Sequence, residues 1–137
     1  MPSTTVRWVT GQQFVGMDEN KHAVVLSGEN DPNGMRPSQM LLIALSACTA
    51  VDVVEILTKK RQPPSHLEIV TTGEHDPEPP WAYRKINVMF RIGGKGLTEK
   101  AVQSAIQLSE EKYCSVSATV RGVAEITTEF EILSGEE

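Results

Sequence analysis

The most apolar part of this chain is the stretch "MRPSQMLLIALSACTAVDVVEILTKKR", residues 35–61, which predicts one long helix. The helix is expected to begin near Pro37 and Ser38, because proline suits a first helical turn and serine can accept a hydrogen bond from free backbone N–H groups. It is expected to end within residues 58–64, where basic side chains lie at the negative helix terminus and prolines follow. About 22 residues rising ~1.5 Å each make a rod of roughly 33 Å, enough to cross a small domain.

The composition of this helix predicts that other elements enclose it, because apolar residues occupy nearly all its faces. Residues 40–57 are apolar enough for a membrane span, but Asp52 and Glu55 lie among them, and charges inside a lone membrane helix are costly. A buried helix of a soluble protein is the better interpretation, and no membrane partner is expected. Full enclosure is difficult within one domain of this size, which favours a second subunit.

Other segments on both sides of the helix carry alternating or β-branched side chains and predict strands. They are residues 4–10, 21–28, 66–75, 81–94 and 122–133, and in the fourth of them Ile86, Val88, Phe90 and Ile92 form one apolar face. Residues 97–113 repeat apolar side chains at helical spacing, with Thr98 available as an N-cap, and predict a second helix that ends just before Cys114. Together these elements predict an α+β fold.

The length and net charge of the chain indicate its domain number and exclude some kinds of partner. The 137 residues fit one domain, residues 1–137, and the formal net charge of −5 without a dense Lys/Arg stretch argues against a nucleic-acid partner. Residues 1–14 lack the features of a targeting segment, so a cytoplasmic protein is expected. His22, His66 and His75 are scattered without metal-ligand spacing, and neither a metal nor a cofactor is expected.

The chain has two cysteines, and their surroundings differ. Cys48 lies at the middle of the helix, where Asp52 and Glu55 are acidic neighbours, whereas a reactive cysteine needs a cation or a hydrogen-bond donor. The helix alone therefore favours an inert packing cysteine, and surface ion pairing with Lys59 or Lys60 is the expected role of the two acids.

Cys114 follows the second predicted helix, where the chain changes direction and side chains are more often exposed, and is a plausible partner thiol. Sequence spacing does not pair it with Cys48, because a disulfide needs Cα atoms within ~7 Å. In a cytosolic protein such a pairing would be transient.

Two motifs resemble those of the OsmC/Ohr superfamily. "RPSQMLLIALSACTAVDVVEILTKK" is similar to its central-helix motif, and "LSEEKYCSVSATV" is similar to its second-cysteine motif. The order of elements agrees along essentially the whole chain, and "CTAxDVVxIL" with "EKYCSV" points to an OsmC-like branch. The resemblance implies an OsmC-like fold, with antiparallel sheets around a long central buried helix, in an intertwined homodimer whose second subunit covers the helix.

The same resemblance implies a thiol-dependent peroxidase that reduces organic hydroperoxides in oxidative-stress defence. By motif match, Cys48 attacks the peroxide and becomes a sulfenic acid, and Cys114 resolves it as a disulfide. A dithiol, such as a lipoyl group on a protein, then reduces the disulfide. An apolar setting suits an organic substrate, and a second thiol stops oxidation before the irreversible sulfinic stage.

One part of the family pattern is missing. Peroxidase members carry a Glu ten residues before the reactive cysteine, paired with an Arg that activates the thiolate, and this chain has Ser38 there. Arg36 is the nearest candidate for the arginine, with Arg7 and Arg121 as weaker ones. Arg36 can act only if its guanidinium comes within hydrogen-bond reach of Cys48.

Two other functions stay open. The missing Glu favours a non-catalytic dimer that binds an apolar or acyl-bearing small molecule at the helix interface, with the cysteines as packing residues. A weaker hypothesis is a redox-sensing thiol protein that signals through a partner.

Overall fold

The computed structural model describes residues 1–133 and divides the chain into two compact units, Met1–Leu41 and Leu42–Glu137. Each unit contains one three-stranded sheet. The secondary structure confirms the α+β fold class. A single domain over residues 1–137 stays a prediction.

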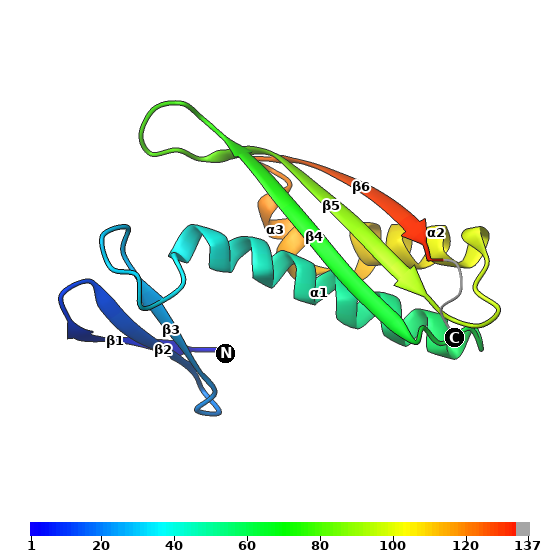
Figure 1. The fold of residues 1–137 in the computed structure, drawn as a ribbon, viewed down its shortest axis with the longest axis horizontal. Helices are drawn as coiled ribbons and strands as arrows, with labels where there is room; N and C mark the ends of the chain where they lie inside the picture. The colour runs from blue at the N-terminus through cyan, green and yellow to red at the C-terminus, as the bar shows by residue number, and fades with distance from the viewer. Residues whose placement is uncertain (134–137) are drawn as a thin grey trace. The chain divides into compact units, whose positions relative to one another are not determined.

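The first unit is a three-stranded antiparallel sheet, and the sequence predicted its first and third strands but not the second. Its strands β1 (Thr4–Thr10), β2 (Gln13–Asp18) and β3 (Ala23–Ser27) lie in chain order (Figure 1). The turn between β1 and β2 contains Gly11 at φ 51°, a left-handed conformation that favours glycine. The loop after β3 is tied back to the sheet, because the buried Ser27 hydroxyl bonds the backbone of Asp31 and Gly34.

Helix α1 (Pro37–Lys59) has the bounds that the sequence predicted. Its buried residues lie four apart along one stripe and are Leu45, Thr49, Val53 and Leu57. The predicted enclosure is therefore only partial within one chain, since Ile43, Val51 and Val54 are exposed. By length and composition α1 could cross a membrane, but a stripe packed into a core is typical of a soluble protein.

The sheet of the second unit has the order β4–β5–β6 and mixed direction. β4 (His66–His75) and β5 (Tyr83–Gly93) form the predicted antiparallel pair, but β6 (Glu125–Ile132) runs parallel to β5. The expectation of antiparallel pairing is thus wrong for this strand. The chain passes through two helices between β5 and β6, a crossover that places the returning strand parallel (Figure 1).

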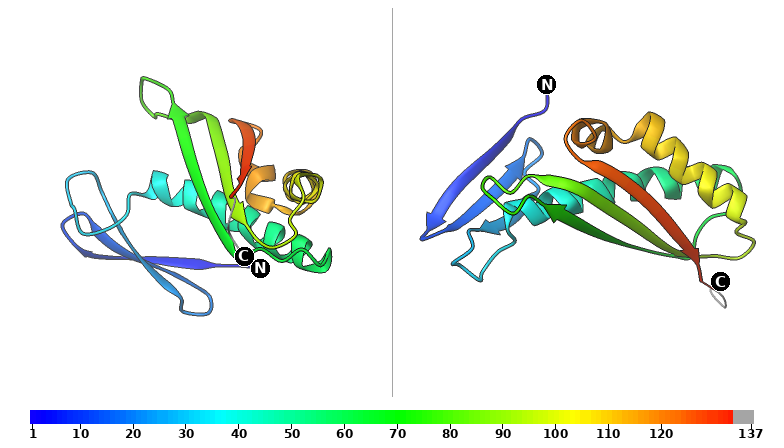
Figure 2. Two further views of the ribbon diagram at one scale, coloured as in Figure 1. Left: turned by 45° about the vertical axis from the view of Figure 1, so that its right-hand side comes forward. Right: turned by 90° about the horizontal axis from the view of Figure 1, so that it is seen from above.

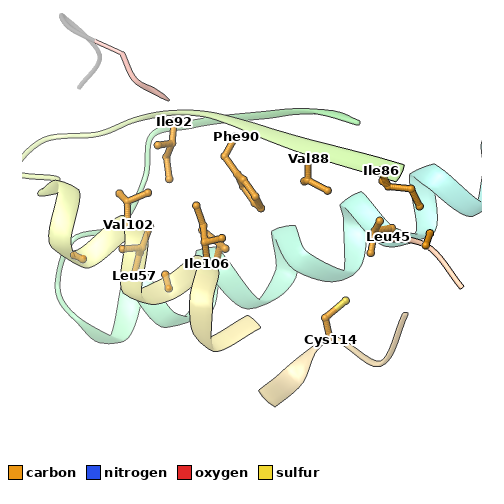
Figure 3. Close-up of a cluster of buried hydrophobic side chains, with 13 residues drawn as sticks. Leu45, Leu57, Ile86, Val88, Phe90, Ile92, Val102, Ile106 and Cys114 are labelled. Atoms are coloured by element: carbon orange, nitrogen blue, oxygen red, sulfur yellow. The ribbon is translucent and has the colours of Figure 1, made fainter. Parts of the chain in front are cut away.

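The core of the second unit lies between this sheet and two helices, α1 and α2 (Glu99–Leu108), on the same face (Figure 2). The predicted apolar face of β5 is buried, and it consists of Ile86, Val88, Phe90 and Ile92. Figure 3 shows Phe90 and Ile92 directed toward Val102 and Ile106 of α2, and Ile86 next to Leu45 of α1.

The segment after β5 differs from the expected single helix. Thr98 caps α2 as predicted, since its hydroxyl accepts the Ala101 N–H at 3.2 Å. The α-helix stops at Leu108, and the next residues form a π-helical turn, η1 (Ser109–Tyr113). A short helix that the sequence did not predict, α3 (Ser115–Val120), then follows Cys114.

Candidate active site: two adjacent thiols

The two cysteines meet in one apolar cluster of the second unit. Cys48 lies on α1 next to the buried Thr49 and is half-buried against the core, while Cys114, between η1 and α3, is a core residue. Both are free thiols. Figure 3 shows the Cys114 sulfur directed toward the cluster that α1 and β5 build. Residues 66 positions apart in the chain are thus brought together, which sequence spacing did not predict.

Their burial is the reverse of the expectation. Cys114 is only 3% exposed although it lies between two elements, and Cys48 at the middle of the apolar helix is the more accessible thiol. The reason is local, because η1 and α3 together turn Cys114 inward. The buried stripe of α1 passes through Thr49 and leaves Cys48 at its edge.

The surroundings of Cys114 favour its protonated form. Burial raises the pKa of the Cys114 thiol, and a hydrogen bond with the Cys48 side chain raises it further. The Ser117 backbone N–H donates to the Cys114 sulfur at 3.3 Å and acts in the opposite direction. Cys48 is thus a neighbour of the Cys114 thiol, which the sequence alone did not show.

Two carboxylates hold the segment that carries Cys114. The Ser109 hydroxyl donates to Asp52 Oδ2 at 2.8 Å, and the Ser117 hydroxyl donates to Glu110 Oε1 at 3.3 Å. Arg121 also binds Glu110, through its carboxylate at 3.0 Å and its carbonyl oxygen at 2.6 Å. The predicted surface pairing therefore fails for Asp52.

Glu55 behaves as predicted. It pairs with Lys59 at 3.1 Å, one turn further along α1.

The three candidate arginines lie in different places. Arg36, in the first unit, is exposed and immediately precedes α1, and Arg7 is exposed on β1. Arg121 belongs to the second unit, and its guanidinium is paired with Glu110. The activating role of Arg36 stays a prediction.

An apolar groove of about 600 Å³ runs between α1 and β4. Its lining consists of Leu42, Ile43, Ser46, Ala47, Ala50, Leu67, Glu68, Ile69, Val70 and Thr71. The hydroxyls of Ser46 and Thr71 are hydrogen-bonded across it at 2.6 Å. Among residues 1–133, no group of three or more His, Cys, Asp or Glu side chains is placed to hold a metal ion.

A long helix with an accessible thiol, a buried second thiol beside it and two three-stranded sheets define an α+β protein of the two-cysteine class. The chain belongs to the OsmC-like protein family, whose model matches residues 28–129 and so includes both cysteines. The resemblance of the motifs is thereby confirmed at the level of the family.

Relatives of known sequence or structure agree with this assignment. Protein YhfA of Escherichia coli K12 is 36% identical over 129 residues, 94% of this chain and 96% of YhfA. A hypothetical protein from Aquifex aeolicus superposes with a TM-score of 0.88 at 28% identity, over 97% of this chain and 96% of that one.

A more distant likeness shows the fold alone. A Legionella pneumophila protein described as an organic hydroperoxide resistance protein OsmC superposes with a TM-score of 0.69 at 11% identity, over 96% of each chain.

Proposed function

We propose that this protein is a thiol-dependent peroxidase that reduces organic hydroperoxides in oxidative-stress defence. Cys48 is the nucleophile and Cys114 the resolving cysteine. The observation that carries the proposal is the adjacency of two free thiols in an apolar cluster, one accessible and one buried. An accessible thiol can meet a peroxide, and the buried one is protected from direct oxidation.

The chemistry balances in three steps. The Cys48 thiolate attacks one peroxide oxygen, the O–O bond breaks, and the alkoxide takes a proton and leaves as an alcohol, with Cys48 as a sulfenic acid. The Cys114 sulfur then attacks the Cys48 sulfur and water leaves, which forms a disulfide. An external dithiol restores both thiols and becomes a disulfide, supplying two electrons and two protons. A lipoyl group on a protein is the proposed reductant.

The geometry supports each step in a different way. The Cys114 thiol packs in the same apolar cluster as Cys48, which suits the resolving step. The accessible side of Cys48 is the one that an organic hydroperoxide would have to approach, since Cys48 is only half-buried against the core. Arg36 is the proposed source of positive charge for Cys48.

Family membership supports a redox function of this kind. The Legionella relative is described as a hydroperoxide resistance protein, whereas the name of YhfA states no activity. We further propose a homodimer, because Ile43, Val51 and Val54 expose apolar area on α1 that a second copy would cover. A cytoplasmic location is a separate part of the proposal.

The test uses cumene hydroperoxide and the reduced protein. One equivalent of peroxide is expected to produce a Cys48–Cys114 disulfide that mass spectrometry detects after digestion, and Cys48→Ser is expected to abolish turnover with dihydrolipoamide. Cys114→Ser serves as the partner variant, because it should leave a sulfenic acid on Cys48. Peroxide consumption that is unchanged in Cys48→Ser would end the proposal.

The groove favours a second candidate, a non-catalytic protein that binds an apolar or acyl-bearing small molecule. In that case Cys48 should react with iodoacetamide no faster than free cysteine at neutral pH. A fluorescent fatty acid should bind tightly, and Ala47→Glu in the groove should prevent its binding.

A further inference from the structure

A chain of hydrogen bonds connects α1 to the backbone of Cys114. Ser109, the first residue of η1, is fully buried, and its hydroxyl donates to Asp52 at 2.8 Å. The carbonyl oxygen of the same Ser109 accepts the backbone N–H of Cys114 at 2.8 Å. One residue therefore bonds α1 with its side chain and Cys114 with its backbone.

Asp52 lies four residues after Cys48, on the same face of α1. The helix thus carries both the first thiol and the acceptor that anchors the segment bearing the second. The hydrogen bond from the Cys114 N–H to the Ser109 carbonyl oxygen joins residues five apart, which is the spacing of a π-helix. Such π-helical turns occur frequently at functional sites. The distance between the two thiols depends on where this turn is attached.

The far end of the turn has its own attachment, which is independent of α1. Glu110 accepts the hydroxyl of the buried Ser117 at 3.3 Å and the guanidinium of Arg121 at 3.0 Å, so η1 is bonded to α3 and the residue after it. These contacts keep η1 and α3 together, but they do not reach α1. Within residues 1–133, the hydrogen bond from η1 that reaches α1 is the one from Ser109 to Asp52.

We propose that Asp52 is a positioning residue for the thiol pair: by accepting the Ser109 hydroxyl, it holds the π-helical turn and Cys114 within bonding distance of Cys48. The proposal rests on the proposed function, because positioning matters there for the resolving step. A carboxylate suits this task, since hydrogen bonds to a charged acceptor are shorter and stronger than neutral ones. Asp52 does not contact the peroxide or either reacting sulfur in this role.

The experiment measures how readily the two thiols form a disulfide, without peroxide. The reduced protein is equilibrated with glutathione disulfide: the two protein thiols become one disulfide, and one glutathione disulfide becomes two glutathiones. At the midpoint, the square of the glutathione concentration divided by the glutathione disulfide concentration gives the effective concentration of one protein thiol toward the other. Asp52→Ala and Ser109→Ala are each expected to lower it about tenfold, the effect of one lost hydrogen bond to a charged group.

Three further variants separate positioning from general damage. Asp52→Asn keeps an acceptor oxygen and should restore most of the effective concentration. Glu55→Gln, on the same helix but exposed and paired with Lys59, should not change it. The double variant Asp52→Ala with Ser109→Ala should lose no more than either single variant, because both remove the same bond.

The outcomes are distinguishable. Unchanged effective concentrations in Asp52→Ala and Ser109→Ala, or additive losses in the double variant, would overturn the positioning role. If Asp52→Ala does not fold, Ser109→Ala decides, since it removes a single oxygen atom. A wild-type protein that forms the disulfide but consumes no cumene hydroperoxide contradicts the proposed function alone, and one that forms no Cys48–Cys114 disulfide contradicts both.

Discussion

Cys114 is a buried thiol whose surroundings raise its pKa and so favour the protonated form. Burial and the hydrogen bond with the Cys48 side chain raise its pKa, and the opposing Ser117 N–H is a weaker influence. A thiol of this kind resists direct oxidation at neutral pH because the thiolate is the reactive form. In the proposed cycle Cys114 loses its proton as it attacks the Cys48 sulfur.

The raised pKa of Cys114 predicts a pH dependence of stability. The folded protein keeps this proton at a pH where the unfolded chain has lost it, so the stabilisation is complete below the unfolded thiol value of about 8.5 and is lost as the pH rises toward the folded pKa. The free energy of unfolding in urea, with a reductant present, should therefore fall more steeply above about pH 8.5 in the wild type than in Cys114→Ser. Parallel slopes in the two proteins would contradict this.

We predict that Arg36 activates the Cys48 thiol. Removing its charge in Arg36→Gln should slow the reaction of Cys48 with cumene hydroperoxide at least about tenfold, because a guanidinium stabilises a neighbouring thiolate. The rate is measured by stopped flow in single turnover. Arg61→Gln, an exposed arginine that follows the end of α1, is the matched control. Equal rates in the two variants would exclude Arg36 from activation.

At the scale of elements, the stability of the second unit depends on the buried face of β5 and on the Thr98 N-cap of α2. Phe90 is the largest fully buried side chain of the core, at the centre of the apolar face of β5. The cap of α2 also organises the site, because η1 follows directly from the end of that helix. Changes in these elements should act on stability first.

Phe90→Ala should lower the free energy of unfolding by about 3–5 kcal/mol, because it removes the buried ring and leaves a cavity. Lys85→Ala, an exposed residue of the same strand, should change it by less than about 0.5 kcal/mol. Urea unfolding followed by circular dichroism measures both. A cost of less than about 1 kcal/mol for Phe90→Ala would contradict the core described above.

Thr98→Ala should lower the free energy of unfolding by about 0.5–2 kcal/mol, because the Ala101 N–H loses its acceptor at the start of α2. Thr98→Ser keeps a hydroxyl and should recover most of the loss. Both values come from the same urea titrations, and an equal loss in the two variants would show that the hydroxyl is not the cause.

At the scale of the whole molecule, the exposed apolar residues of α1 need an explanation. Val51 is 65% exposed, on a helix whose opposite stripe is fully buried. A soluble protein seldom leaves such a row open to water, so a second copy of the chain is the proposed cover. Both thiols belong to one chain, so the proposed disulfide step does not itself require the second copy, whereas the activation of Cys48 by Arg36 is a separate prediction.

Val51→Glu should shift the protein from dimer to monomer, because a charge in an apolar interface is left unpaired. Sedimentation velocity at micromolar concentration measures the change. Val123→Glu is the control, since Val123 is similarly exposed but lies outside α1. A wild-type monomer, or an unchanged dimer in Val51→Glu, would contradict the proposed interface.

Local patterns predicted most of the fold. Alternation in residues 86–92 indicated the buried face of β5, and Pro37 indicated the start of α1. The patterns did not reveal the parallel direction of β6 or the π-helical turn at Ser109. A strand sequence is compatible with either direction of pairing, and a π-turn depends on contacts with elements distant in the chain.

What the sequence by itself determined is therefore most of the elements, their order, the family and the two cysteines that we propose bear the chemistry. Only the tertiary structure decided that Cys114 is the buried thiol, that it lies beside Cys48, and that Asp52 accepts the Ser109 hydroxyl. Periodicity records how a residue relates to its near neighbours along the chain. The distance between α1 and η1 depends instead on how both pack against β5, which no local pattern encodes.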